Sequence, residues 1–330
     1  MANINLPASS PEEAYALMSI VADMAPAQRP TIMLHGEPGS SKSSLVRQLS
    51  LARFGKPPID VRAATIEASD VKGLPDLDRS KDRIVWRKPD FLPRSGEGVL
   101  FFDEVTSARR DVIAALYSIA LDRRVDDLEL PAGYMIVFAG NDVSDGAIAH
   151  DMGTAMNDRL MHIHVRPTAA SFVSYWEARD LHPAILALIT QMPHLLSQNE
   201  DRIANDYIAS PTPRSWERAS NMMKAIIASN PKTSEQLLRL AMSGIVGQQA
   251  AEHLILTWSD MNECADPRLL LAMDIARDTQ KLRKALPKTA RAGIGLAYAF
   301  GHMCEKPDDI VKAIAIMALF EMQAPDASGQ

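Results

Sequence analysis

One stretch near the amino terminus joins an apolar run to a glycine-containing turn and the start of a helix. It reads Thr31-Ile32-Met33-Leu34-His35-Gly36-Glu37-Pro38-Gly39-Ser40-Ser41-Lys42-Ser43-Ser44. The apolar residues predict a short buried strand, and the alternation of polar and apolar positions from Lys42 to Phe54 predicts a helix. A glycine-rich turn between a strand and a helix N-terminus directs backbone N–H groups inward, so this stretch predicts a phosphate-binding site.

The same turn carries the side chains that a nucleoside triphosphate requires. Lys42 places a cation at the outer phosphates, and the Ser43 hydroxyl is suited to bind Mg²⁺. The consensus has glycine where this chain has Ser41, and a side chain at positive φ costs about 1 kcal/mol. We therefore expect ATP and Mg²⁺ as cofactors. The expected cradle consists of Gly36, Glu37, Pro38, Gly39, Ser40, Ser41, Lys42, Ser43 and Ser44.

A second motif is an apolar run that ends in two adjacent acids, Val99-Leu100-Phe101-Phe102-Asp103-Glu104. Asp103 is predicted to hold Mg²⁺ through water. Glu104 is predicted to orient and deprotonate the water that attacks the γ-phosphate. The alternative is that both acids cap a helix that begins near Ser107.

Three further polar residues complete the predicted catalytic set. Asn141 follows the next apolar run, where its amide would reach the attacking water or the γ-phosphate beside Glu104. Arg159 precedes the last predicted strand, and we expect it at the active edge of the sheet, pointing into the ATP of a neighbouring subunit as a charge-stabilising finger. Arg214 opens a helix in the second half of the chain, from which it would report the nucleotide state. Surface salt bridges are the alternative for both arginines.

Strands and helices alternate along the first half of the chain, after a capped helix at 10–24. Further strands are expected at 59–62, 99–102, 134–139 and 161–165. This alternation predicts an α/β fold with a parallel sheet, whereas the sequence beyond Arg166 predicts helices only. The expected parts are an α/β nucleotide-binding domain at 1–167, a helical lid at 168–256 and a C-terminal helical extension at 257–330 with a disordered tail.

Composition and charge exclude several classes of protein. Of the 330 residues, 47% are hydrophobic and 23% are charged, but no run reaches the roughly 18 apolar residues of a membrane span. The amino terminus lacks the features of a signal peptide, so we expect a cytoplasmic location with Cys264 and Cys304 reduced. The net charge of −6 disfavours nucleic-acid binding. The arginine pairs at 109–110 and 123–124 are expected to be solvated or to lie between subunits.

In combination, these motifs resemble those of the AAA+ ATPases, and specifically of the MoxR-like branch, over about residues 10–320. The turn at 36–43 resembles the family's P-loop, in which a small residue such as alanine often precedes the lysine. The other motifs are similar in the same order: Asp103-Glu104 to Walker B, Asn141 to sensor 1, Arg159 to the arginine finger and Arg214 to sensor 2.

The resemblance extends to segments outside the nucleotide motifs. Residues 69–93 are similar to a hairpin that this branch inserts, with a tip at 78–82 that would face the pore or upper surface of a ring. The alternative for 78–82 is an ordinary charged turn. Residues 125–131 are similar to a second hairpin before the sensor strand. Residues 243–251 resemble the helix that ends the lid.

The resemblance implies a P-loop AAA+ core followed by an all-α lid, with ATP bound between the subunits of a hexameric ring. It also implies ATP-driven remodelling or activation of a client protein, chaperone-like in character, through a partner with a von Willebrand factor A domain. One alternative is a nucleic-acid-associated motor that uses the inserted hairpins. Another is a module that assembles with ATP and does not turn it over.

Overall fold

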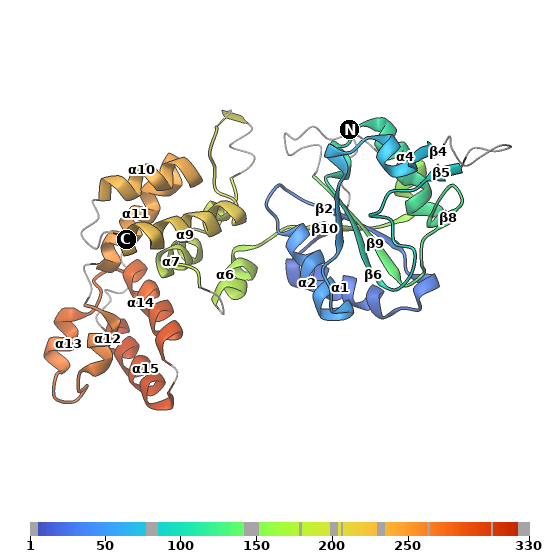
Figure 1. The fold of residues 1–330 in the computed structure, drawn as a ribbon. Helices are drawn as coiled ribbons and strands as arrows, with labels where there is room; N and C mark the ends of the chain where they lie inside the picture. The colour runs from blue at the N-terminus through green and yellow to red at the C-terminus, as the bar shows by residue number, and fades with distance from the viewer. Residues whose placement is uncertain are drawn as a thin grey trace. The chain divides into compact units, whose positions relative to one another are not determined.

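The computed structural model describes residues 6–76, 85–141, 152–177, 180–198, 204–205, 207–229, 235–262, 265–304 and 306–322. The chain divides into two compact units, Met1–Pro167 and Thr168–Gln330. The first contains a sheet flanked by helices, and the second is helical (Figure 1). The expected hairpin tip at 78–82, Cys264 and the tail after 324 lie outside the described residues.

Six described strands of the first unit form one parallel sheet in the order β1-β10-β2-β9-β6-β3. They are β1 (Ala8–Ser9), β2 (Thr31–His35), β3 (Ile59–Arg62), β6 (Gly98–Asp103), β9 (Tyr134–Gly140) and β10 (Leu160–Val165). β6 and β9 are buried along their whole length, which explains their nearly continuous apolar sequences. The predicted strands and the parallel sheet are confirmed. β1 was not predicted, because two residues are too few to give a periodic pattern.

Helices cover both faces of this sheet. On one face, α1 (Pro11–Asp23) and α2 (Lys42–Phe54) pack against strand residues such as Leu34 and Val137. On the other, α4 (Arg110–Asp122) and α5 (Thr154–Asn157) pack against residues such as Met33 and Phe102. α1 begins where predicted: Ser10 Oγ accepts from the Glu13 N–H at 3.2 Å, and Glu13 Oε2 accepts from the Ser10 N–H at 2.7 Å.

Two short antiparallel pairs interrupt the α/β alternation, at the two places where hairpins were expected. The first follows α3 (Ala68–Lys72) and consists of β4 (Leu74–Asp76) and β5 (Val85–Arg87). The second consists of β7 (Arg124–Val125) and β8 (Leu128–Glu129). Lys88 connects them: its side chain is only 4% exposed, and its Nζ donates to Asp126 Oδ2 at 2.5 Å and to the Lys72 carbonyl oxygen at 3.2 Å.

The second unit is built around Trp216, which is fully buried and donates from Nε1 to the Leu195 carbonyl oxygen at 2.9 Å. Its apolar surroundings come from neighbouring helices and from the 3₁₀ helix at Pro193–Leu196. The helices of this part are α6 (Ala169–Glu177), α7 (Pro183–Gln191), α9 (Pro213–Ser229), α10 (Glu235–Val246) and α11 (Gln248–Asn262). The absence of strands among the described residues agrees with the prediction.

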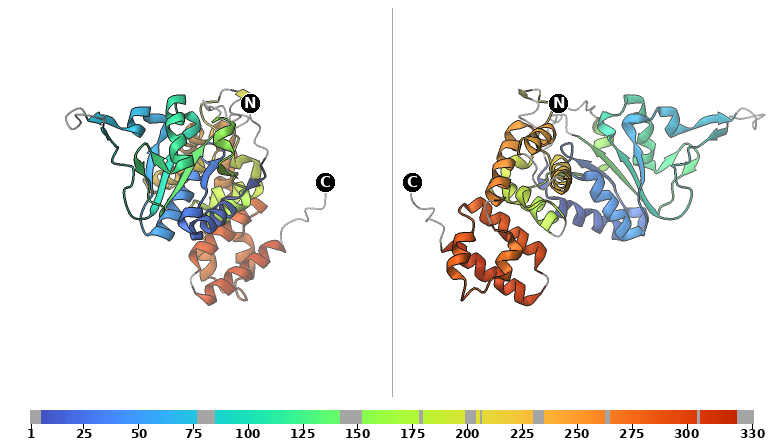
Figure 2. Two further views of the ribbon diagram at one scale, coloured as in Figure 1. Left: turned by 90° about the vertical axis from the view of Figure 1, so that its right-hand side faces the viewer. Right: turned by 60° about the vertical axis from the view of Figure 1, so that its left-hand side comes forward.

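A second apolar cluster lies near the end of the chain, around Leu282, Phe300 and Ile316. It is formed by α12 (Pro267–Ala272), α13 (Thr279–Ala285), α14 (Ala290–Met303) and α15 (Pro307–Glu321). Figure 2 shows these helices, orange to red, grouped at one end of the unit. The expected division at 256 falls inside α11, and α14 packs against α7 and α11. The lid and the extension therefore belong to one compact unit.

The segment 243–251, which resembles a single helix at the end of the lid, is instead two helices with a turn between them. α10 ends at Val246, Gly247 has φ of 83°, and α11 begins at Gln248. A Cβ at Gly247 would lie 2.8 Å from the Ala209 carbonyl oxygen. The close approach of this loop and the positive φ both require glycine here.

Candidate functional site

The turn between β2 and α2 brings its backbone close to the neighbouring strand β10. φ is 149° at Gly36, 85° at Gly39 and 70° at Ser41. A Cβ on Gly36 would lie 2.3 Å from the Val165 carbonyl oxygen, so a side chain does not fit. Ser41 has the positive φ expected at the position of the consensus glycine, and its side chain makes no capping hydrogen bond to α2.

Lys42 is the first residue of α2 and is buried, with 7% of its surface exposed. Its Nζ donates to the carbonyl oxygens of Gly36 at 2.6 Å and Glu37 at 3.0 Å, and to Ser40 Oγ at 3.2 Å. A buried ammonium group needs such partners to offset the loss of water. Because these acceptors are uncharged, phosphate oxygens would compete with them effectively for the lysine.

The carboxyl end of β6 places Asp103 next to the start of α2. Ser43 Oγ donates to Asp103 Oδ2 at 2.7 Å, and Asp103 Oδ1 accepts from the Glu104 N–H at 2.9 Å. The short helix after Glu104 has no side-chain cap, and α4 begins only at Arg110. The alternative that the two acids cap a helix therefore has no support in these contacts. A hydroxyl and a carboxylate are the hard oxygen ligands that suit Mg²⁺.

Glu104 has φ of 59° and contacts a residue that the sequence analysis did not select. Arg62 Nη1 lies 3.4 Å from Glu104 Oε1, and the two side chains are 55% and 42% exposed. Arg62 ends β3 and pairs in register with Asp103. Two residues earlier, burial and the nearby Asp103 carboxylate raise the pKa of Asp60. A basic residue at the end of a predicted strand was the available signal for Arg62.

Asn141 follows β9, which lies between β2 and β6 in the sheet. Its Oδ1 is 3.3 Å from Lys42 Nζ. Its backbone is held by Thr106, whose Oγ1 accepts from the Asn141 N–H at 3.0 Å and lies 3.1 Å from the Asn141 carbonyl oxygen. Thr106 was also not predicted from the sequence. The ends of three adjacent strands thus bring Lys42, Asp103 and Asn141 to one edge of the sheet.

Arg159 lies at the amino-terminal ends of the parallel strands, at the opposite edge of the sheet from the nucleotide turn. This position corrects the expectation for this residue. It directly precedes β10, and Leu160 pairs with Thr31 at the beginning of β2, whereas the nucleotide turn follows the end of β2 at His35. Along the strand direction, the length of β2, roughly 13 Å at 3.3 Å per residue, therefore separates Arg159 from the nucleotide turn. The Arg159 side chain is exposed.

Arg214 belongs to the second unit, where it is exposed in the first turn of α9. The start of this helix is held by Thr212 and Ser215: Ser215 Oγ accepts from the Thr212 N–H at 2.7 Å, and Thr212 Oγ1 accepts from the Ser215 N–H at 3.1 Å. The helix predicted to begin here is confirmed. The role of Arg214 toward a nucleotide stays a prediction.

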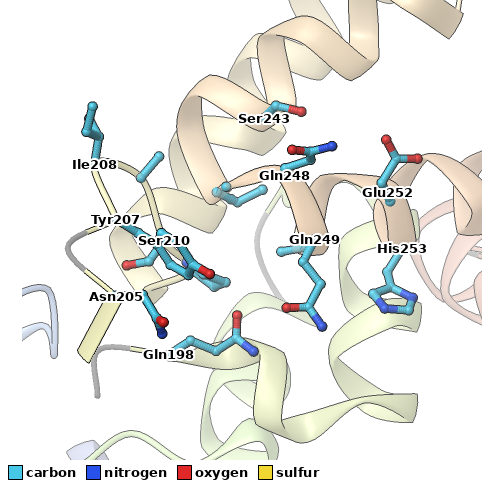
Figure 3. Close-up of a pocket in the computed structure, with 15 residues that line it drawn as sticks. Gln198, Asn205, Tyr207, Ile208, Ser210, Ser243, Gln248, Gln249, Glu252 and His253 are labelled. Carbon is cyan, nitrogen blue, oxygen red and sulfur yellow. The ribbon is translucent and has the colours of Figure 1, made fainter. Parts of the chain in front are cut away.

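The same unit contains a pocket of about 810 Å³, beside the turn between α10 and α11. Figure 3 shows side-chain amides of Gln198, Asn205, Gln248 and Gln249 around it. Glu252 also lines it, and this carboxylate is paired with Arg239. The lining is therefore rich in neutral hydrogen-bonding groups.

Residues 31–160 match a family model described as the AAA domain, dynein-related subfamily. The matched segment begins with β2 and ends with the first residue of β10, so it includes the turn, the Asp103-Glu104 pair and Asn141. The first unit has an AAA+ P-loop core. A comparison with curated protein sequences gives no match.

Many solved structures resemble the chain at low identity. The match to NtrX from Brucella abortus covers 97% of this chain and 68% of the NtrX chain, with 14% identity and a TM-score of 0.42. The match to the Holliday junction branch migration motor RuvB from Thermotoga maritima covers 94% of this chain and 86% of RuvB, with 14% identity and a TM-score of 0.41. The match to Hsp104 covers 71% of this chain and 44% of the Hsp104 chain, with 14% identity and a TM-score of 0.40. Similarity this distant carries no argument about the function of the AAA+ core described above.

Proposed function

We propose that the first unit binds Mg²⁺-ATP and hydrolyses it. The observation that carries this proposal is the hydrogen bond of 2.7 Å between Ser43 and Asp103, since it joins the start of α2 to the strand that ends in Glu104. The Asn141 amide, 3.3 Å from Lys42, supports the same site. An AAA+ core provides the backbone cradle for the phosphates.

Each of these residues has one role in the proposed reaction. Lys42 exchanges its carbonyl acceptors for oxygens of the β- and γ-phosphates, and Asn141 orients the γ-phosphate. Ser43 and Asp103 would hold Mg²⁺, which neutralises charge on the phosphates when bound. Glu104 accepts a proton from the attacking water once its carboxylate moves away from Arg62.

We propose that Arg159 completes the site of a neighbouring subunit in a ring, most simply a hexamer. Its place at the edge opposite its own P-loop supports a role in trans. A cationic guanidinium from the neighbour would then stabilise charge in the transition state. Arg214 of the second unit would sense the nucleotide.

Among the described residues, no helix combines the length and apolar character needed to cross a bilayer.

The output that we propose is remodelling or activation of a client protein in the cytoplasm, as in MoxR-like proteins that work with von Willebrand factor A domain partners. The two inserted hairpins support this assignment, since they occupy the positions expected for that branch. One residue of each arginine pair makes contacts within the chain, which gives no support for a nucleic-acid role. Arg123 donates to the carbonyl oxygens of Pro131 and Tyr134, and Arg109 pairs with Asp111.

The first test is Glu104→Gln, which keeps the shape of the side chain and removes the base. We expect ATP affinity to stay within about two-fold and turnover to fall at least about 100-fold, in line with the contribution of a general base. Binding of a fluorescent ATP analogue and release of phosphate are the two measurements. Glu129→Gln on β8 is the matched control and should behave as the unsubstituted protein. Unchanged turnover in Glu104→Gln would overturn the mechanism.

The same assays separate the two alternatives. Stimulation of phosphate release by single- or double-stranded DNA would favour a nucleic-acid motor over a protein remodeller. ATP-dependent assembly without phosphate release would favour a module that binds ATP only to assemble. Neither result is expected.

A further inference from the structure

Two histidines link the nucleotide turn to the opposite edge of the sheet. His35 is the last residue of β2 and directly precedes Gly36, while His162 lies on β10. His35 Nε2 is 2.8 Å from His162 Nδ1, and His162 Nε2 is 2.8 Å from the Asn157 carbonyl oxygen. The two rings are stacked, with centroids 5.0 Å apart. We call this chain of two hydrogen bonds the histidine relay.

The strand register explains why these rings meet. His162 is the partner of Met33, and His164 is the partner of His35. Because alternate residues of a strand point to the same face, the three histidines share the face that α4 and α5 cover. The relay runs diagonally on this face, from the end of β2 back to the end of α5. Arg159 follows Asn157 by two residues, so the relay ends beside the Arg159 turn, residues 157–159.

The acceptor at one end determines the direction of both hydrogen bonds. A carbonyl oxygen only accepts, so His162 must donate from Nε2 to Asn157. A neutral His162 then has an unprotonated Nδ1, which accepts a hydrogen bond from the His35 Nε2–H. Both rings are therefore donors in the same direction, from β2 toward α5.

The surroundings keep His35 neutral. Burial, reinforced by the neighbouring His162, His164 and Lys42, lowers the pKa of His35 to about 4. At pH 7 this ring carries its Nε2 proton and no charge, which is the form that the relay requires. The hydrogen bonds are thus compatible with ordinary working conditions.

We propose that His162 is a positioning residue that couples the P-loop of a subunit to its own Arg159 turn. The inference rests on the proposed role of Arg159 in a neighbouring subunit. Through the relay, the state of the nucleotide in one subunit affects the arginine offered to the next. His162 would therefore belong to the ATPase machinery without touching the nucleotide.

The coupling has a physical starting point in the P-loop itself. Lys42 Nζ donates to the Gly36 carbonyl oxygen at 2.6 Å, and Gly36 follows His35 directly. When phosphate oxygens replace this acceptor, the backbone at the start of the turn is released from the lysine. The His35 ring, its partner His162 and the Asn157 carbonyl then shift together, since hydrogen bonds join them. These contacts form a contiguous path from Lys42 to the Asn157 carbonyl oxygen, and a hydrogen-bonded path of this kind can carry energetic coupling between two sites.

The test compares His162→Phe, which fills the same space without hydrogen bonds, with His162→Gln, which retains a donor for the Asn157 carbonyl. For His162→Phe we expect kcat for ATP to fall about 10- to 100-fold with KM changed less than about two-fold, as misplacement of a remote catalytic group produces. His162→Gln should recover at least half of the lost activity on a logarithmic scale. His164→Phe, on the same strand and face, leaves the relay in place and should keep kcat within about two-fold.

A double-mutant cycle identifies where His162 acts. In an Arg159→Ala background, His162→Phe should lower kcat by less than about two-fold, because both changes disable the same arginine. Full additivity, or a kcat of His162→Phe equal to that of His164→Phe, would overturn the inference. The failure of the proposed function is distinguishable, since the unsubstituted protein would then show no turnover at all. Binding of the fluorescent ATP analogue confirms that each variant is folded.

Discussion

At the residue scale, the ion pair between Glu104 and Arg62 restrains the proposed base. The two side chains lie 3.4 Å apart and are about half exposed. An exposed pair of this kind is worth about 0.2–1 kcal/mol. That energy is too small to hold the carboxylate permanently, but it is enough to shift how often Glu104 faces the attacking water. We therefore expect Arg62 to lower basal turnover.

Removal of this restraint gives a residue-scale prediction. Arg62→Ala should raise phosphate release at saturating ATP by about 1.4- to 5-fold, the population shift that corresponds to a pair of this strength. Steady-state ATPase assays measure the change. Arg53→Ala, which removes an exposed pair with Asp23, is the matched control and should have no effect. A slower Arg62→Ala would show that the arginine assists hydrolysis and does not restrain it.

Ser41 supplies a second residue-scale prediction. Its φ of 70° is unfavourable for a residue with a side chain, and that side chain makes no cap. Ser41→Gly should therefore increase the free energy of unfolding of the first unit by about 1 kcal/mol. Urea denaturation measures it. Ser44→Gly, inside the first turn of α2, is the opposite control and should decrease stability, because glycine weakens a helix. A destabilised Ser41→Gly would contradict this account.

At the scale of elements, Lys88 joins the two inserted hairpins. Its buried ammonium contacts Asp126 and Asp127 of the β7–β8 turn as well as the Lys72 carbonyl at the end of α3. Elements connected in this way move together, since separating them would leave a buried cation without partners. If the hairpins contact a client, they should do so as one surface.

Lys88→Met tests this connection, because methionine keeps an apolar stem and removes the charge. We expect the free energy of unfolding of the first unit to fall by about 1.5–3 kcal/mol, as for the loss of a hydrogen bond to a charged group. Hydrogen exchange should increase in both β5 and β8. Lys281→Met, which removes an exposed pair with Asp278, should change stability by less than about 0.5 kcal/mol. Equal effects of the two variants would refute the connection.

At the scale of the whole molecule, each unit has its own apolar core. Leu116 on α4 is fully buried in the first unit, and Trp216 on α9 is fully buried in the second. The core of the AAA+ unit is made by strands that lie far apart in sequence. The helical unit depends on contacts among successive helices.

Reciprocal core substitutions test this separation. Trp216→Ala should destabilise the second unit by about 3–5 kcal/mol, and Leu116→Ala should destabilise the first by about 2–5 kcal/mol. Hydrogen exchange resolved by peptide should show loss of protection in α9 for the former variant and in α4 for the latter. Binding of the ATP analogue should survive Trp216→Ala. Loss of protection throughout the chain in either variant would show that the two cores unfold as one.

The residues that the sequence analysis found and missed differ in how they reach the site. Lys42 and Ser43 lie within the nucleotide turn, and Asp103 ends an apolar run, so short patterns identify them. Arg62 and Thr106 reach Glu104 and Asn141 only through strand and loop packing. His162 meets His35 across 127 positions of sequence. No local pattern records such a contact.

The sequence by itself determined the strand, turn and helix around Lys42, the alternation that builds the AAA+ core and the helical nature of the second unit. These follow from local periodicity, glycine placement and the chemistry of adjacent residues. Only the tertiary structure decided which strand ends meet. The order β10-β2-β9-β6 brings Asn141 and Asp103 to Lys42, and the parallel register puts Arg159 at the far edge. Strand order and register depend on packing between distant segments, which a local pattern does not encode.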